Sequence, residues 1–227
     1  MLNKNDKRIR IITGHYGSGK SEFAVNYAVQ LRKETEDKVA IADLDVVNVY
    51  FRTRERKDEM RAMGIHPIDS SVDAPSLDIP ALSAEITAPM HDKSYQYVID
   101  LGGDNVGARV ISRFRASVPD DEYDLLFVIN GNRERTQTAE EVLQYIDEIE
   151  KSSQLKVTGL INNTHMLKAT TVEDVLKGQE IAKEVSKVRN IPIRYVSCLE
   201  DVAKQLPEDI EGTVLPINLF MRSDWMM

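Results

Sequence analysis

The chain has 227 residues, of which 42% are hydrophobic and 29% charged, and its formal net charge is −8 at pH 7. This composition is typical of a globular protein, and the length suits a single domain over residues 1–227. The acidic balance argues against nonspecific binding to nucleic acid or to an anionic membrane, and the lone cysteine, Cys198, excludes an intrachain disulfide.

The N-terminal sequence MLNKNDKR is polar and lacks the apolar stretch of a signal peptide. No uninterrupted apolar run approaches the roughly 20 residues that a membrane-spanning helix needs. We therefore expect a cytoplasmic protein that has neither a membrane nor a nucleic acid as a partner.

Short apolar runs alternate along the chain with longer amphipathic stretches. Most of the runs are rich in β-branched residues and almost continuously apolar, which is typical of strands covered on both faces in a parallel sheet. The runs expected to form strands are 8–13, 38–44, 97–101, 124–129, 156–161 and 193–196.

Three stretches between these runs place apolar residues at helical spacing: 21–32, 139–150 and 172–189. A chain that repeats strand, helix and strand forms right-handed crossovers. The expected fold is therefore α/β: a doubly wound, mostly parallel sheet with helices on both faces.

The segment from about residue 60 to residue 93 is the least regular part of the chain. It contains Pro67, Pro75, Pro80 and Pro89, and we interpret its stretch DSSVDAPSLDIP as loop and short turns. The segment is too weakly patterned to form a domain, so we expect an excursion that lines one edge of the site.

The strongest motif lies between the first apolar run and the first expected helix. The stretch GHYGSGKS matches the phosphate-loop pattern G-x-x-x-x-G-K-[ST] in the required strand–loop–helix context. Its glycines allow successive N–H groups to point at phosphate oxygens, and the helix that follows adds the positive end of its dipole. The residues expected to bind the nucleotide are Gly14, His15, Tyr16, Gly17, Ser18, Gly19, Lys20 and Ser21.

Within this motif we assign Lys20 to the β- and γ-phosphates and the Ser21 hydroxyl to magnesium. A second magnesium ligand is Asp100, which ends the run YQYVID, at the carboxyl end of a hydrophobic strand where α/β sheets bind ligands. Asp43 and Asp45 leave another strand with their side chains on the same side. Two carboxylates this close repel each other unless a cation or a water network lies between them, and magnesium with an oriented water satisfies both.

The units GHYGSGKS, IADLD, VIDLGG and GLINN follow one another in the same order as in the MinD/ParA and CobQ/CobB nucleotide-binding proteins. The chain resembles this class of P-loop NTPases over nearly its whole length, from about residue 8 to residue 220. The resemblance implies ATP and Mg²⁺ as ligands.

The resemblance also implies residue roles. Asp43 belongs to the magnesium shell, Asp45 orients the attacking water, and Asp100 with Gly103 forms a switch that detects the γ-phosphate. One of Asn162 and Asn163 reads the adenine edge, and its offset from the start of GLINN favours Asn163. Residues 194–201, just past the last expected strand, flank the base.

The sequence departs from the MinD/ParA subgroup at the start of the loop. His15 stands where that subgroup has a lysine that reaches into a partner subunit, and Tyr16 stands where it usually has glycine. The departure puts the trans-acting lysine in doubt but leaves Lys20 and the backbone donors in place. His15 is either a substitute phosphate contact or a residue that packs or faces solvent.

The roles of two groups of basic residues stay open. The stretch FRTRERK either clamps an anionic ligand or forms a solvated helix face, and its charge pattern favours the second interpretation. Arg133 and Arg135 follow the fourth expected strand and so lie at the ligand-binding edge of the sheet, without an assigned role.

These observations favour a magnesium-dependent ATPase that acts as a nucleotide-dependent switch, as a homodimer or on a protein partner. The alternative from the same fold class is an ATP-dependent small-molecule kinase or ligase that takes an acidic substrate. A third hypothesis is a nucleotide-binding regulator with negligible turnover.

Overall fold

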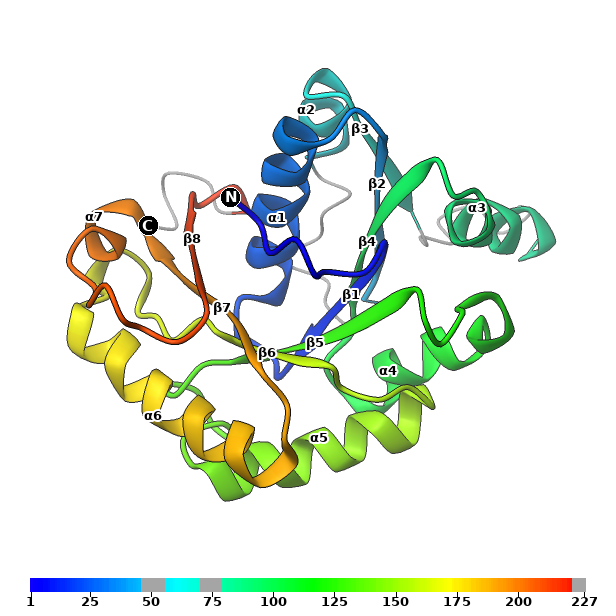
Figure 1. Ribbon diagram of the computed structural model, residues 1–227. Helices are drawn as coiled ribbons and strands as arrows, with labels where there is room; N and C mark the ends of the chain where they lie inside the picture. Colours follow the sequence, from blue (N-terminus) through cyan, green and yellow to red (C-terminus); the bar gives the residue numbers. More distant parts are fainter. Residues whose placement is uncertain (46–55, 70–78, 222–227) are drawn as a thin grey trace.

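The computed structural model describes residues 1–45, 56–69 and 79–221. These residues form one sheet whose strands are all parallel, in the order β3-β2-β4-β1-β5-β6-β7-β8 (Figure 1). The strands are β1 (Ile9–Gly14), β2 (Lys38–Leu44), β3 (Ile65–Asp69), β4 (Tyr95–Leu101), β5 (Tyr123–Ile129), β6 (Gly159–Asn162), β7 (Ile193–Leu199) and β8 (Thr213–Ile217). The α/β fold with a doubly wound sheet is confirmed, and the described strands contain no antiparallel pair.

Helices cover both faces of the sheet (Figure 1). The α-helices are α1 (Lys20–Glu34), α2 (Lys57–Ala62), α3 (Ile79–His91), α4 (Asn105–Ser112), α5 (Ala139–Ser153), α6 (Val172–Arg189) and α7 (Glu200–Ala203). Short 3-10 turns lie at Arg115–Ser117 and Leu167–Ala169. None of the helices among the described residues is apolar over a length that would cross a bilayer.

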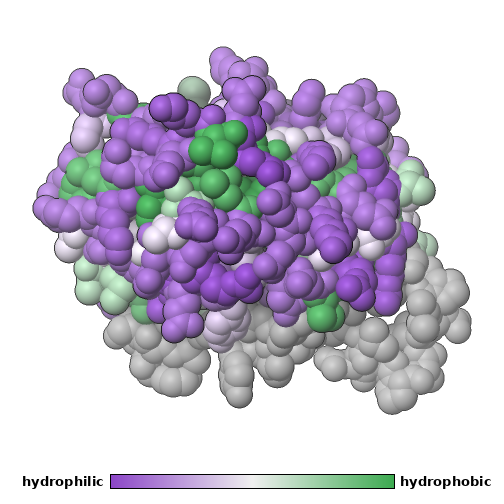
Figure 2. Space-filling model, turned by 90° about the horizontal axis from the view of Figure 1, so that it is seen from below, coloured by the Kyte–Doolittle hydropathy of each residue, from purple (hydrophilic) through white to green (hydrophobic). Residues whose placement is uncertain are grey.

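Alternate residues of the central strands belong to two separate cores. Ile11 of β1 belongs to a core that includes residues of α3, α4, α5 and α6, and Ile12 belongs to a second core that includes residues of α1. This alternation explains why the strands are apolar along their whole length, since both faces of a doubly wound sheet are buried. Figure 2 views the molecule from the side of α5 and α6, where most of the visible surface is hydrophilic.

The helix starts follow local chemistry. α5 and α6 each begin with a capping box, formed by Thr138 with Glu141 and by Thr171 with Asp174. α4 is capped by Asp104, whose carboxylate accepts the N–H of Gly107. α1 differs, because its N-cap is Gly19 and no side chain caps it.

The described part of residues 60–93 is more regular than expected. The described part of this segment contains the end of α2, the edge strand β3 and the helix α3. Pro67 is tolerated because β3 lies at the sheet edge, and Pro80 because it falls in the first turn of α3. The prolines therefore concealed regular structure, and residues 70–78, with most of DSSVDAPSLDIP, lie outside the described residues.

Candidate functional site

The loop between β1 and α1 lies at the carboxyl edge of the sheet, with β4 and β5 on either side of β1. Gly19 has a φ of 85°, and a Cβ at this position would lie 2.3 Å from Nδ2 of Asn163, so only glycine fits. Because no side chain caps α1, the N–H groups of its first turn remain available to an anion.

Lys20, the first residue of α1, is only 4% exposed. Its Nζ lies 2.8 Å from Oδ2 of Asp45. Burial by itself lowers the pKa of Lys20, but the carboxylates of Asp100, Asp45 and Asp43 outweigh it and hold this pKa above the usual value. Lys20 is therefore an ammonium ion at neutral pH, at the place where the motif predicts a phosphate-binding lysine.

The three predicted carboxylates converge beside Lys20. Asp43 of β2 and Asp100 of β4 face each other in register, and both are buried. The backbone N–H of Asp45 donates to Oδ1 of Asp43 at 3.0 Å. The structure thus brings together residues that are far apart in the sequence.

The oxygen donors of Ser21, Asp43 and Asp100 suit magnesium. Mg²⁺ usually binds one or two carboxylates together with phosphate oxygens and waters, not an all-protein cage. Asp43, Asp100 and the Ser21 hydroxyl match this pattern, and no cage of three or more His, Cys, Asp or Glu side chains occurs in the part of the chain that the structure describes. The residues therefore fit a magnesium ion that arrives with a nucleotide.

Gly103 packs directly on the end of β1. A Cβ at this position would lie 1.8 Å from the carbonyl oxygen of Gly14, so a side chain here would displace the loop. The Gly103 carbonyl accepts a hydrogen bond of 2.6 Å from the Tyr145 hydroxyl of α5. Gly103 is therefore next to the phosphate loop, as predicted, and it also connects the loop to α5, which the sequence did not suggest.

Asn162 and Asn163 point to different places. Asn162 donates to the Val175 carbonyl and to Gln179, both in α6. Asn163 donates to the Ser18 carbonyl at 2.8 Å and accepts from the Ser197 hydroxyl at 2.8 Å. Asn163 is thus the one of the two that reaches the phosphate loop, and its contact with a base stays a prediction.

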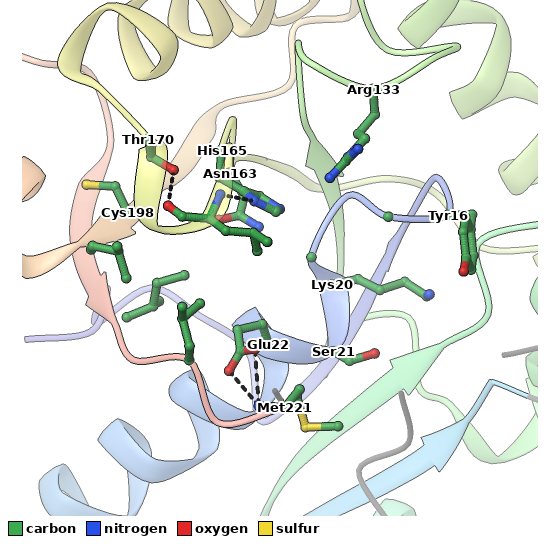
Figure 3. A pocket seen from close by; sticks show the side chains of 16 residues that line it. Tyr16, Lys20, Ser21, Glu22, Arg133, Asn163, His165, Thr170, Cys198 and Met221 are labelled. Atoms are coloured by element: carbon green, nitrogen blue, oxygen red, sulfur yellow. Dashed lines mark hydrogen bonds between the residues drawn. The ribbon is translucent and has the colours of Figure 1, made fainter. Parts of the chain in front are cut away.

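A cavity of about 250 Å³ extends from the phosphate loop toward β7 and the segment after β8 (Figure 3). Its polar end contains Lys20 and Ser21. Its other end is mostly apolar and is lined by Leu167, Cys198, Leu199, Ile217, Leu219 and Met221. The cavity therefore has one end suited to phosphate and one end suited to a flat apolar group.

The prediction that residues 194–201 lie past the last strand is wrong. Ile193–Leu199 are β7 itself, and β8 follows it as the edge strand. Only Cys198 and Leu199 of this stretch line the cavity. Burial raises the pKa of the Cys198 thiol to about 11, so it is a neutral wall residue.

The segment after β8 closes the apolar end and was not predicted as part of the site. The side chain of Asn26 exchanges two hydrogen bonds of 2.8 Å with the backbone of Asn218. The Glu22 carboxylate accepts the N–H groups of Phe220 and Met221 (Figure 3 shows the bonds to Met221). No local pattern in the sequence indicated this contact, because the partners of Glu22 and Asn26 lie more than 190 positions away.

The side chains of the two unusual loop residues, His15 and Tyr16, have different surroundings. Tyr16 is 61% exposed. His15 lies edge-on to the ring of Tyr145, with the ring centroids 5.4 Å apart. Burial lowers the pKa of His15, and the positive charge of Arg135 lowers it further. His15 is therefore neutral at pH 7 and adds no positive charge to the loop.

Two of the basic residues without an assigned role lie near the site. Arg133 lines the cavity, and the guanidinium of Arg135 lies 4.7 Å from the centroid of the Tyr145 ring. Arg56 pairs with Glu59 at 2.7 Å, as expected for a solvated helix face. Arg52 and Arg54 lie outside the described residues.

No protein-family model and no curated protein matches this chain. Among solved structures, it is similar to FtsY from Mycoplasma mycoides, with a TM-score of 0.56 and 19% identity over 86% of this chain and 61% of that one. It is also similar to the cell division protein FtsY from Thermotoga maritima, with a TM-score of 0.56 and 21% identity over 88% of this chain and 64% of that one. FtsY from Elizabethkingia anophelis in complex with GDP gives a TM-score of 0.53 and 17% identity over 87% of this chain and 58% of that one.

The chain has a P-loop NTPase-like fold. It spans about three fifths of the length of these FtsY chains. At this level of identity the likeness establishes the fold alone, so the finer resemblance to the MinD/ParA and CobQ/CobB proteins stays a prediction.

Proposed function

We propose that this protein binds ATP with magnesium and hydrolyses it as a nucleotide-dependent switch, as a homodimer or on a protein partner. One observation carries the proposal. The buried ammonium group of Lys20 and the uncapped amino end of α1 meet at the polar end of a cavity. A polyanion can bind both, by replacing Asp45 as the partner of Lys20.

The phosphate and magnesium contacts follow from this arrangement. The N–H groups of residues 14–19 and the Lys20 ammonium bind the phosphates. Ser21, Asp43 and Asp100 hold magnesium, which neutralises part of the phosphate charge. Asp43 and Asp100 lie side by side on β2 and β4, which supports a shared ligand.

Adenine is favoured over guanine by the lining of the apolar end. Guanine presents N–H donors on its Watson–Crick edge, and a carboxylate is the acceptor that recognises them best. Among the described residues that line the cavity, Glu22 supplies the one carboxylate, and it already accepts the N–H groups of Phe220 and Met221. Beyond its bonds to Ser18 and Ser197, the Asn163 amide retains one N–H and one oxygen lone pair, and this pair of donor and acceptor suits adenine.

The switch rests on two contacts near the site of the γ-phosphate. Asp45 pairs with Lys20 in the ligand-free protein, so a phosphate that takes Lys20 sets Asp45 free to orient water. Gly103 lies against the end of β1 and is bonded to Tyr145 of α5. Binding and loss of the γ-phosphate thereby alter the end of β2 and the contact with α5, which a partner can detect.

The first test is substitution of the lysine. Lys20→Ala removes the one buried ammonium group at the phosphate end, and we expect loss of ATP binding by at least about 100-fold, as measured by calorimetry with magnesium and ATP. His15→Ala in the same loop is the matched control, and we expect ATP affinity to stay within a few-fold because this side chain is neutral. Wild-type affinity in the Lys20 variant contradicts the proposed site.

A turnover assay separates the switch from its alternatives. ATP hydrolysis whose specific rate rises with protein concentration supports a homodimeric switch. Hydrolysis that requires a carboxylated or hydroxylated metabolite indicates a kinase or ligase instead. Tight binding without turnover under either condition indicates a regulator that only binds nucleotide.

A further inference from the structure

Arg133 lies in a rigid turn that follows β5. The Arg133 N–H donates to the Asn130 carbonyl at 2.9 Å, and the Thr136 hydroxyl donates to the same carbonyl at 2.7 Å. The Asn130 side chain accepts the N–H of His165, which ties the turn to the loop after β6. Asn130 and Thr136 are fully buried. The backbone of Arg133 is therefore held in a fixed place beside the site.

The Arg133 side chain extends from this turn over the phosphate loop and into the cavity (Figure 3). A Cβ built on Gly17 would lie 3.5 Å from Nε and 3.7 Å from Cδ of Arg133, so the arginine lies beside the loop at Gly17. Its Nε is inaccessible to solvent and has no hydrogen-bond partner among the described residues. A buried N–H group of a cation is costly to leave unbonded, so this atom points to a ligand.

The net charge of the site favours a second cation at its phosphate end. Three buried carboxylates, Asp43, Asp45 and Asp100, surround the single ammonium group of Lys20. The phosphate end is therefore negative before a nucleotide arrives. Magnesium held by Asp43 and Asp100 would offset two of these charges, and the remaining negative charge of the phosphate chain favours a second cation. His15 occupies the position of the trans-acting lysine and is neutral, so it does not correct this balance.

We propose that Arg133 is the second phosphate-binding cation of this site, supplied by the same chain, and that it binds an oxygen of the nucleotide's phosphate chain through Nε and the guanidinium fork. The inference rests on the proposed function and deepens it. A guanidinium forms short, charge-assisted hydrogen bonds with phosphate and is always charged, so it performs in cis the task for which the loop has no second lysine.

The experiment compares Arg133→Gln, Arg133→Lys and the wild-type protein in calorimetric titrations with magnesium-ATP and with magnesium and inorganic tripolyphosphate. We expect Arg133→Gln to weaken both ligands about 10- to 100-fold, by the same factor, because the lost contact is to phosphate. Arg133→Lys keeps the charge but loses the fork, so we expect an intermediate loss. Thermal unfolding of the ligand-free variants should stay within about 2 °C of wild type, which excludes a loss of fold.

Arg135→Gln is the matched control, because Arg135 lies in the same turn but pairs with Glu148 at 2.8 Å instead of lining the cavity. Its affinity for both ligands should stay within about three-fold of wild type, a change below roughly 0.7 kcal/mol. Unchanged affinity in Arg133→Gln overturns the inference while leaving the proposed function intact. Loss of ATP affinity without loss of tripolyphosphate affinity also overturns it, because the contact is then to base or ribose. Absence of binding by the wild-type protein contradicts the proposed function itself.

Discussion

At the scale of single residues, the central feature is the ion pair between Lys20 and Asp45. Both side chains are buried, and their atoms approach to 2.8 Å. The lysine that the motif assigns to phosphate is thus bonded to the carboxylate that the family resemblance assigns to water. A nucleotide bound as proposed would replace Asp45 as the partner of Lys20, so its binding would compete with an internal contact.

This competition predicts the behaviour of Asp45→Asn. The amide cannot form the ion pair, so Lys20 is released at lower cost, and we expect ATP affinity to be equal to wild type or up to about 10-fold higher. The amide also cannot accept a proton from water, so single-turnover hydrolysis should slow by about 100-fold or more. The two quantities are measured by equilibrium titration and by rapid quench.

Asp201→Asn, on the exposed side of α7, is the matched control and should change neither quantity. A clear fall in ATP affinity in Asp45→Asn would mean that Asp45 contacts the nucleotide or its metal rather than competing with it.

How much of the site could be predicted depends on how far apart its residues lie in the sequence. The spacing within GHYGSGKS is local, so Lys20 and Ser21 could be assigned from the sequence. Asp43 and Asp100 also could, because the carboxyl ends of parallel strands meet at one edge. The contact of Tyr145 with Gly103 could not, because it depends on how α5 packs. Arg133 could be placed at the ligand-binding edge, but its position beside Gly17 depends on the turn after β5 and could not be predicted.

At the scale of elements, α1 performs two tasks. Its amino end faces the phosphate loop, and its side holds the segment after β8 through Glu22 and Asn26. These contacts join residues that are more than 190 positions apart, which is why no local pattern revealed them. The helix therefore connects both ends of the cavity.

Glu22→Ala should distinguish the contributions of the apolar end and the phosphate end of the cavity to ATP affinity. It removes the acceptor of two backbone N–H groups, so Leu219 and Met221 lose their fixed place in the apolar wall. We expect ATP affinity to fall about 10-fold and tripolyphosphate affinity to stay unchanged, as measured by calorimetry. Glu34→Ala, at the other end of α1, where the carboxylate accepts the N–H of Leu2, is the matched control and should alter neither. An equal loss for both ligands would show that Glu22 supports the phosphate loop instead.

Elements with an undisturbed pattern were predicted well. The bounds of α6 and β2 agree with the expected ranges 172–189 and 38–44, since both are long, regular and free of proline. α3 was missed because Pro80 and Pro89 interrupt its pattern, although a proline in the first turn replaces an N–H that has no partner in the helix. β8 was missed because it is a short edge strand.

At the scale of the whole molecule, the buried tyrosines bind the layers together. Tyr27 of α1 and Tyr195 of β7 both donate to the Asp6 carboxylate, and the Tyr97 hydroxyl of β4 donates to the Ile86 carbonyl of α3 at 3.0 Å. Burial raises the pKa of each of these phenols far above its usual value. All three are neutral in the folded protein.

Because these hydroxyls are buried, we expect the protein to unfold in alkali. Above about pH 10 the phenols ionise in the unfolded chain but not in the folded one, so proton release favours unfolding as the pH rises. We expect the phenolate absorbance of the buried tyrosines to appear together with the loss of helical circular dichroism, in one cooperative step. Complete ionisation near pH 10 with an intact helical signal would contradict the burial of these hydroxyls. Tyr97→Phe, which cannot ionise, should shift the step to higher pH.

The central position of β1 also bears on how the protein is made. Its neighbours in the sheet, β4 and β5, are Tyr95–Leu101 and Tyr123–Ile129. The hydrogen bonds to Glu22 come from Phe220 and Met221, which are synthesised later still. A nascent chain leaving the ribosome thus carries GHYGSGKS long before the strands that flank it exist. During synthesis the motif is present without its binding site, and a nucleotide bound as proposed can stabilise the fold only after Phe220 and Met221 have been made.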